Sequence, residues 1–320
     1  MILDRISKLV VEPFNKHFLE KINRHLVDPY NKRFFDPFYK RFFSITKDTW
    51  KYYAMFHPTS EKILRNSGHP IWGPLVRRLY RFEGENYATQ GHILPLNKSL
   101  DKSERISKSM IMPVDLIKKA VRESSYRIMM DRCLCRDAFE CKDYPRDFGC
   151  LMLGQACKRM VETGIARSIT VEEALGFVDK ASDLGLVSIL GWAEFEAVGK
   201  GIAYEDHTNY FEICFCCPCC CLGLRNYKHM HKSEHMRNIF RTIGWRAQGS
   251  DACIRCGKCV RVCPMECISL DGDGVLVGSE CVGCGVCSVN CPENAIVMKE
   301  LVPMKDDLLD YFWGVRPNIT

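Results

Sequence analysis

Two cysteine runs near the end of the chain have the spacing of metal ligands. Residues 253–264 read CIRCGKCVRVCP, and residues 281–292 read CVGCGVCSVNCP. Both are C-x2-C-x2-C-x3-C-P, which is typical of [4Fe–4S] sites, because a tight loop can direct three thiolates to one cubane. Gly257, Gly283 and Gly285 allow the close backbone approach that such loops need. The chemistry indicated is one-electron transfer. Zinc ribbons are the alternative, but they pair two C-x2-C knuckles rather than two four-cysteine runs.

On these two motifs, residues 251–300 resemble a bacterial-type dicluster ferredoxin, and the resemblance implies a small α+β fold. In such ferredoxins the fourth cysteine of each motif ligates the other cluster. The resemblance thus implies one cluster held by Cys253, Cys256, Cys259 and Cys291, and another held by Cys281, Cys284, Cys287 and Cys263. When the motifs are aligned, Cys267 falls opposite Ala295, so we expect Cys267 to be a small packing residue. Between the motifs, CISLDGDGVLVGSE alternates around an Asp-Gly pair, which predicts a short hairpin.

The remaining eleven cysteines form two groups, and residues 1–132 contain none. Two short groups separated by a helical insert can converge in space. The candidate ligands of a third metal site are Cys133, Cys135, Cys141, Cys150, Cys214, Cys216, Cys217, Cys219, Cys220 and Cys221. Three interpretations stay open: a further iron–sulfur cluster bound by both groups, a zinc or other structural site, or thiols that pack or act as a redox dithiol. Cys157 lies in a helical pattern beside Met160 and is expected in the core.

Three histidines follow the second cysteine group. His231 and His235 are separated by one helical turn, and zinc binding together with Cys217 and Cys220 is conceivable. However, the surrounding segment YKHMHKSEHMR, which also holds His229, is strongly polar. We therefore favour a solvated basic helix over a histidine-containing metal site.

The order of the cysteine-rich segments supplies a second resemblance. CLCRDAFECKDYPRDFGCLMLG is followed by VEEAL, then by ICFCCPCCC, and then by the tandem motifs. Over residues 90–300 this order resembles a family of cysteine-rich iron–sulfur proteins from strict anaerobes. The resemblance implies a redox function and supplies no particular reaction.

Helical spacing dominates the region before the tandem motifs. Residues 113–130 carry an apolar stripe that begins at Pro113, and residues 149–164 have similar spacing. Thr170 and Glu173 form a capping-box pattern at the start of a third helix. The fold class expected is α+β, with mainly helical N-terminal and middle regions before a small ferredoxin-like dicluster domain. The expected segments are 1–110 (basic, aromatic-rich docking segment), 111–249 (helical cysteine-rich domain), 250–300 (dicluster domain) and 301–320 (tail).

The front of the chain is basic and aromatic. Residues 11–43 repeat the pattern EPFNKHF, DPYNKRFF and DPFYKRFF. Residues 1–50 hold ten Lys and Arg against six Asp and Glu, whereas residues 251–300 hold four against seven. Aromatic and arginine side chains are enriched in protein interfaces. We therefore expect residues 1–50 to dock a larger redox subunit, one that uses flavin, molybdenum, tungsten or iron–sulfur. Contact with an anionic membrane surface is the alternative, and no nucleic-acid motif accompanies the charge.

Twenty cysteines in 320 residues raise the alternative of a disulfide scaffold. Such scaffolds belong to short secreted chains. The N-terminus has charges inside its apolar stretch, unlike a secretory signal, and no apolar run approaches the roughly 18 residues that span a bilayer. We expect a cytoplasmic protein with reduced thiols, and peripheral contact with the inner membrane face is an alternative.

The function expected from the sequence is electron transfer. We expect an iron–sulfur subunit that carries two [4Fe–4S] clusters to or from a catalytic partner in an anaerobic oxidoreductase complex, and not a catalyst in its own right. The alternative is a redox enzyme, or a redox or metal sensor, that uses a cluster, zinc site or dithiol formed by the middle cysteines. The sequence holds no Gly-rich nucleotide fingerprint and no nucleophile-plus-base signature.

Overall fold

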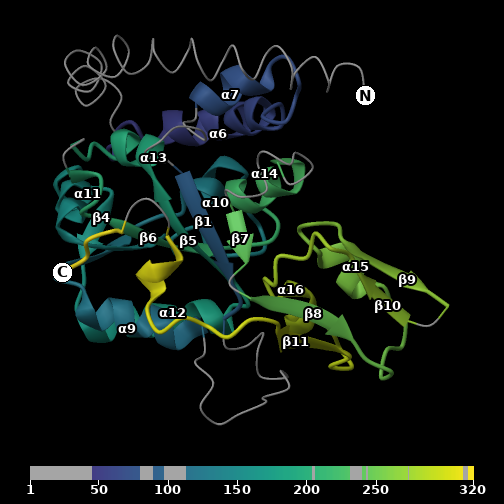
Figure 1. Ribbon diagram of the computed structural model, residues 1–320. Coiled ribbons are helices and arrows are strands. Elements are labelled where there is room, and N and C mark those ends of the chain that lie inside the picture. The colour runs from purple at the N-terminus through teal and green to yellow at the C-terminus, as the bar shows by residue number, and fades with distance from the viewer. Residues whose placement is uncertain are drawn as a thin grey trace.

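The computed structural model describes residues 45–79, 89–96, 113–203, 206–230, 240–242, 244–272, 274–312 and 316–320. The aromatic repeat predicted at residues 11–43 lies outside these ranges, as do His231 and His235. Within the described part of the chain, strands and helices together form an α+β protein (Figure 1).

A large sheet forms the centre of the molecule. Its strands are β1 (Thr89–Leu94), β2 (Arg127–Met130), β3 (Leu151–Leu153), β4 (Ala166–Ser168), β5 (Val187–Ala193), β6 (Phe211–Cys216) and β7 (Phe240–Thr242). Their order across the sheet is β4-β2-β3-β6-β5-β1-β7. Neighbouring strands are antiparallel, except that β1 and β7 are parallel. The central strand β6 is almost wholly buried; it carries Cys216 into the core, and Cys214 is half-buried.

Helices cover the sheet on both sides. They are α6 (Trp50–Leu64), α7 (Gly73–Leu79), α9 (Pro113–Glu123), α10 (Leu134–Ala138), α11 (Lys158–Glu162), α12 (Val171–Asp183), α13 (Glu194–Gly199) and α14 (Leu222–Met230). The helices α9 and α12 lie together at one side of the sheet, and α6 and α7 lie at the opposite side (Figure 1). The predicted capping box starts α12: Thr170 Oγ1 accepts from the backbone N–H of Glu173, and Glu173 accepts from that of Thr170.

The expectation of a mainly helical middle region is not supported. Residues 113–130 begin as the predicted helix, but the chain switches to strand β2 at Arg127. Residues 149–164 contain strand β3 and a 3-10 turn at Gln155–Cys157, and only then the short helix α11. Short apolar runs such as RIMM and LML have no distinguishing periodicity. Burial between helices on both faces of the sheet makes these runs strands.

A second unit follows the sheet. It contains β8 (Trp245–Gly249), α15 (Lys258–Val262), β9 (Ile268–Asp271), β10 (Gly274–Val277), α16 (Val286–Val289) and β11 (Ile296–Glu300). The strands β9 and β10 form the antiparallel hairpin predicted around the Asp-Gly pair, and β8 pairs with β11. In Figure 1, α16 lies nearer to the large sheet than α15 does. The first and last strands of this unit hold its two halves together.

The backbone of the two cysteine motifs repeats. Residues with positive φ occur in matched pairs, one in each motif: Arg255 (59°) with Gly283 (62°), Gly257 (69°) with Gly285 (80°), and Glu266 (52°) with Asn294 (56°). Gly257 and Gly285 precede helices α15 and α16, where a left-handed residue turns the chain from the cysteine loop into the helix. The sequence repeat is thus also a conformational repeat.

Residues near both ends of the described chain join the central domain. Strand β1, from the front of the chain, pairs with β5 in the sheet. The tail contains a 3-10 turn at Leu308–Tyr311 and then returns to the sheet domain, where the carbonyl of Ile319 accepts from the backbone N–H of Ser125 at 2.7 Å. This hydrogen bond therefore fixes the tail beside the residues that lead into β2.

Candidate iron–sulfur and metal-binding sites

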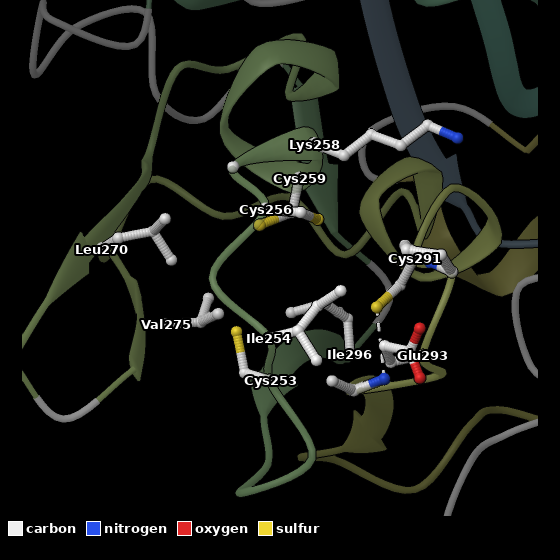
Figure 2. A pocket seen from close by; sticks show the side chains of 13 residues that line it. Cys253, Ile254, Cys256, Lys258, Cys259, Leu270, Val275, Cys291, Glu293 and Ile296 are labelled. Atoms are coloured by element: carbon white, nitrogen blue, oxygen red, sulfur yellow. Dashed lines mark hydrogen bonds between the residues drawn. The ribbon is translucent and has the colours of Figure 1, made fainter.

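Four cysteines surround a cavity beside α15 that, counting space open to solvent, has a volume of about 330 Å³ (Figure 2). Cys253, Cys256 and Cys259 come from the first motif, and Cys291 is the last cysteine of the second. Most of the remaining lining is apolar, and Lys258 and Glu293 also belong to it; the apolar side chains include Ile254, Leu270, Val275, Ala295 and Ile296. Four thiols around an open, apolar space are what a [4Fe–4S] cluster requires, so the donor set fits that group.

Backbone N–H groups point at two of these sulfur atoms. The N–H of Arg255 donates to Cys253 Sγ at 3.4 Å. The N–H of Ala295 donates to Cys291 Sγ at 3.2 Å, which is the dashed line in Figure 2. Hydrogen bonds to cysteine sulfur stabilise the thiolate and raise the reduction potential of a cluster that it ligates. The loop conformation therefore both turns the chain and directs N–H donors at the sulfur atoms of the candidate ligands.

A second cavity, of about 290 Å³, lies beside α16. Cys281, Cys284 and Cys287 of the second motif line it together with Cys263 of the first. Each cavity therefore brings together three cysteines of one motif and the fourth of the other, which is the crossed arrangement that the ferredoxin resemblance implies. The similar cavity volumes fit two groups of the same kind.

Cys267 is a fifth thiol at the second cavity. Its Sγ atom lies 3.7 Å from that of Cys263, and the residue is half-buried. A hydrogen bond from Cys267 lowers the pKa of Cys263 to about 6, against the opposing effect of burial. The same donor lowers the pKa of Cys281 to about 6. The sequence alignment predicted a packing residue here, but Cys267 contacts two of the candidate ligands.

The two cavities differ in their exposure to solvent. At the first, Cys256 is exposed and Ile254 is 61% exposed. At the second, every residue from Val282 to Ser288 is buried. The repeat in sequence and backbone therefore does not extend to the surroundings, because α16 lies nearer to the sheet domain than α15 does (Figure 1).

One apolar cluster connects the buried cavity to the sheet domain. Its members from the second unit include Met265, Val282, Cys284 and Val286, and its members from the sheet domain include Ile93, Val187, Ile189, Cys216, Cys221 and Leu224. Cys214, Cys263 and Cys267 pack against the same cluster. The buried cavity and part of the middle cysteine group are therefore separated by packed side chains and not by solvent.

The two middle cysteine groups converge, as their spacing allowed. Cys141, Cys217, Cys219 and Cys220 place their Sγ atoms all within 4.8 Å of one another. The Sγ atoms of Cys141 and Cys219 are 3.7 Å apart. Three of these thiols come from the turn between β6 and α14, and the fourth from the loop after α10. We call this set the four-thiol group.

The pKa of Cys217, a member of the four-thiol group, is lowered to about 5. A hydrogen bond from Cys219 makes the largest contribution, and the backbone N–H of Cys220 and the charge of Arg136 act in the same direction against burial. By contrast, burial and a hydrogen bond to Cys141 raise the pKa of Cys220 to about 12. Local contacts thus favour the deprotonated form at one member of the group.

The other middle cysteines form a hydrogen-bonded chain that we call the six-thiol group. It runs from Cys150 through Cys214 and Cys216 to Cys221, and from Cys133 through Cys135 to the same Cys221. The Sγ atoms of Cys150 and Cys214 are 3.1 Å apart. Hydrogen bonds from Cys135 and Cys216 lower the pKa of Cys221 to about 6, against burial. Cys221, which directly precedes α14, is therefore the thiol that accepts the last hydrogen bond of both branches.

Glu212 borders the six-thiol group and accepts from Cys214 at 3.0 Å. Its carboxylate also accepts from the buried ammonium of Lys200 at 2.5 Å. Burial raises the pKa of Glu212, but the charge of Lys200 and the hydrogen bonds outweigh it and bring the pKa to about 2. Because the ammonium of Lys200 already neutralises this carboxylate, Glu212 is better suited to stabilising the fold than to binding a metal ion.

Arg136 lies between the two thiol groups, and sequence reasoning missed it. The residue is completely buried. Nη1 donates to the carbonyl of Phe215 at 2.9 Å, and Nη2 donates to that of Phe148. Burial lowers the pKa of Arg136, but electrostatic interactions with nearby cysteines outweigh burial, and the net shift is upward; these cysteines are Cys133, Cys217, Cys150 and Cys216. Its position between Cys135 and Asp137 in a cysteine-rich loop was the only signal.

Helix α6 anchors the loops that carry these cysteines. Trp50 Nε1 donates to the carboxylate of Asp137 at 2.8 Å. Farther along the helix, Glu61 accepts from Arg225 at 3.1 Å, and Arg225 in turn donates to the carbonyl of Cys219 at 3.2 Å. Both ends of α6 are therefore bound to elements of the four-thiol group.

Two remaining sequence candidates are placed away from these groups. Cys157 is fully buried and donates to the carbonyl of Leu153 at 3.2 Å, which agrees with the packing role expected of it. His229 is half-buried near the end of α14. The zinc site considered for His231 and His235 with Cys217 and Cys220 involves two histidines that lie outside the described residues.

Comparison with known protein families identifies the type of domain that the second unit forms. The family model of the 4Fe-4S binding domain matches residues 250–269 and 276–297, one motif in each match. A comparison with curated proteins and a comparison with solved structures both gave no match. Within the described ranges, no helix has the length and apolar character to cross a bilayer. The chain thus carries a ferredoxin-type iron–sulfur domain, which supports a role in electron transfer.

Proposed function

We propose that this protein is an electron-transfer iron–sulfur subunit that carries two [4Fe–4S] clusters and exchanges electrons with a catalytic partner in an anaerobic oxidoreductase complex. One observation carries the proposal: two cavities of similar size, each lined by three cysteines of one motif and the fourth of the other. The match of both motifs to the 4Fe-4S binding domain supports the same reading.

The chemistry that such clusters supply when bound is one-electron oxidation and reduction. The chain supplies the thiolates, the N–H groups that donate to them, and the apolar lining that limits water. Cys253, Cys256, Cys259 and Cys291 would hold the cluster at the exposed cavity. Cys263, Cys281, Cys284 and Cys287 would hold the cluster at the buried cavity. Cys267 would then be a thiol hydrogen-bond donor beside the second ligand set.

The difference in exposure assigns separate tasks to the two cavities. Ile254 and Cys256 stand at the surface, so a redox partner can approach the first cavity closely. The loop from Val282 to Ser288 is enclosed by protein, and it faces the sheet domain. In our proposal the first cavity is the site at which electrons are exchanged with an external partner, and the second cavity faces the middle cysteines.

Helices α6 and α7 support the proposal of a docked partner. Together with the turn between them, they expose six large apolar side chains: Tyr52, Met55 and Phe56 on α6, Ile71 and Trp72 in the turn, and Leu75 on α7. Isolated apolar side chains are normal on a surface, whereas a group of them on adjacent helices is typical of an interface. These residues continue the basic, aromatic front for which docking was predicted. We propose that residues 1–50 and this surface bind the larger redox subunit together.

A single experiment tests the core of the proposal. The full chain, purified without oxygen, is reduced and then mixed in a stopped-flow instrument with an oxidised redox dye. We expect the visible absorption of the clusters to return as the dye is reduced, without any other substrate. A chain that holds iron but neither accepts nor delivers electrons would contradict an electron-transfer role.

A second function is favoured by the position of the six-thiol group. Cys216 and Cys221 share an apolar cluster with Cys284 and Met265 of the buried cavity. A redox enzyme, or a redox sensor, in which these thiols are oxidised and reduced would use that proximity. The two functions differ in the number of electrons that one chain accepts. Two electrons fit the two clusters alone, and further equivalents that disappear in Cys216→Ala would favour a redox-active thiol group.

A further inference from the structure

We infer that the four-thiol group is a tetrathiolate site for a single soft metal ion, zinc or iron, separate from the two ferredoxin clusters. The inference concerns Cys141, Cys217, Cys219 and Cys220, and it does not depend on the electron-transfer proposal. Neither cysteine run in this region has the spacing of a known cluster motif, so the site rests on the folded arrangement.

The distances fit one ion. Four thiolates that bind one metal ion at about 2.3 Å in a tetrahedron have sulfur atoms about 3.8 Å apart. All four Sγ atoms lie within 4.8 Å of one another, and the distance between those of Cys141 and Cys219 is 3.7 Å. A disulfide would bring two sulfur atoms to about 2.05 Å, far closer than this.

The same distances do not fit a cubane. In a [4Fe–4S] cluster each thiolate binds a different iron, so the four sulfur atoms surround the whole cluster and stand well apart. The ferredoxin cysteines line two pockets, each from several positions around it. The only Cys, His, Asp and Glu groups within 4.8 Å of one another in the described ranges lie in the sheet domain. The four-thiol group therefore has the size of a mononuclear site.

The charge around the group requires an anion. Arg136 is protonated at any physiological pH and is completely buried. Among the described residues no carboxylate forms an ion pair with it, and its guanidinium donates to the backbone carbonyls of Phe148 and Phe215. Buried charges need a compensating charge. Four thiolates around a divalent ion carry net negative charge and would supply this compensation.

Hydrogen bonds from residues outside the four-thiol group also hold its ligands in place. Arg225 donates to the carbonyl of Cys219 at 3.2 Å and is itself paired with Glu61 of α6. The loop with Cys141 is fixed by Asp137, which accepts from Trp50, Arg132 and Arg146. Outer contacts that orient ligands in this way are characteristic of metal sites. Tetrahedral sulfur coordination selects zinc or iron among the common ions.

Metal analysis of the full chain, purified without oxygen, tests the inference. We expect about eight irons per chain for two [4Fe–4S] clusters and about one further ion, zinc or iron. Cys141→Ser and Cys219→Ser should each lose that ion and keep the cluster irons. Cys157→Ser is the matched control, because it alters a buried cysteine of the same domain outside the group, and it should keep all the metal. X-ray absorption at the edge of the extra metal should give sulfur ligands at about 2.3 Å.

Thiol mapping of the unaltered chain covers the case in which a variant fails to fold. The four cysteines should resist alkylation until a chelator removes the ion, and then react together. Full cluster iron without any further ion would overturn the inference, as would four further irons with a cubane spectrum. Loss of all cluster iron with retention of the extra ion would contradict the proposed function and leave this inference standing, so the two failures are distinguishable.

Discussion

Arg136 and Phe215 are joined inside the core by a hydrogen bond of 2.9 Å from Nη1 to the backbone carbonyl oxygen. The bond ties the first cysteine loop to the strand that leads into the second cysteine group. The guanidinium also interacts electrostatically with cysteines of both thiol groups. One residue therefore couples the fold of the middle region to the charge of its thiols.

Replacement of Arg136 should affect stability and metal retention together. Arg136→Met keeps the volume but removes the charge and both donors, and breaking a buried charge pair costs about 3–5 kcal/mol. We expect a drop of that size in the free energy of unfolding by urea, with loss of the extra ion. Arg136→Lys keeps the charge and should retain more of the metal than the Met variant. A Met variant with full metal content would rule out the counter-charge role.

Asp137 should make the stability of the cysteine loop depend on pH. Burial raises the pKa of this carboxyl, but hydrogen bonds from Arg132, Arg146 and Trp50 outweigh it, and the net shift is downward. A lowered pKa stabilises the fold above the ordinary Asp pKa of about 3.9, and that contribution disappears as the pH falls through the folded value. Asp137→Asn should therefore cost about 2 kcal/mol at pH 7.

The comparison of the two proteins across pH checks this sign. The difference in unfolding temperature between the unaltered chain and Asp137→Asn should be constant near neutral pH and shrink below about pH 4. Both proteins hold the same cysteines, so loss of metal in acid affects them alike. A difference that grows as the pH falls would exclude the lowered pKa.

The crossed arrangement of the ferredoxin ligands predicts which cavity each fourth cysteine serves. Cys291→Ser should remove the cluster of the exposed cavity, and Cys263→Ser that of the buried one, with a loss of about four irons in each case. Cys267→Ala should keep both clusters and shift only the potential of the buried one, because Cys267 contacts ligands without being needed as one. Iron analysis with EPR of the reduced proteins measures all three. Loss of a whole cluster in Cys267→Ala would make it a ligand.

Charge near the exposed cavity should control the rate of reaction with ionic oxidants. Lys258 is exposed and belongs to the lining of that cavity, and in Figure 2 its side chain extends away from the cysteines. Lys258→Glu should slow oxidation of the reduced protein by ferricyanide several-fold at low ionic strength, because the oxidant is an anion. The effect should fade toward 1 M salt, where the Debye length is about 3 Å.

Lys299→Glu is the matched control for this prediction. Lys299 is also exposed in the second unit, but it lies on β11 and does not line the exposed cavity. It carries the same change in net charge. Equal slowing by both variants would mean that ferricyanide does not react preferentially at the exposed cavity.

The ferredoxin unit was predictable because its information is local. Spacing alone brought Cys253, Cys256 and Cys259 into one loop, and the Asp-Gly pair located the hairpin. The contact of Cys267 with two candidate ligands was not predictable, because aligning it with Ala295 compares positions in the sequence and gives no information about contacts in space. Its sulfur lies 3.7 Å from that of Cys263 because the backbone turns at Glu266, where φ is 52°.

The middle region was less predictable because its contacts are distant in the chain. Cys141 and Cys219 meet only because β3 and β6 are neighbours in a sheet that the sequence did not indicate. Periodicity could not separate short buried strands from buried helix, so segments such as Arg127–Met130 were predicted as helix. The capping box at Thr170 was predicted correctly, because both of its partners lie within one turn.

The most direct test of the account is a reductive titration of the full chain, followed by EPR with iron counted in the same sample. The account predicts about eight irons per chain and uptake of one electron at each of two [4Fe–4S] clusters, with signals broadened by the interaction of two neighbouring clusters. A chain that binds zinc in the two ferredoxin cavities, or that holds iron but takes up no electrons, would contradict it.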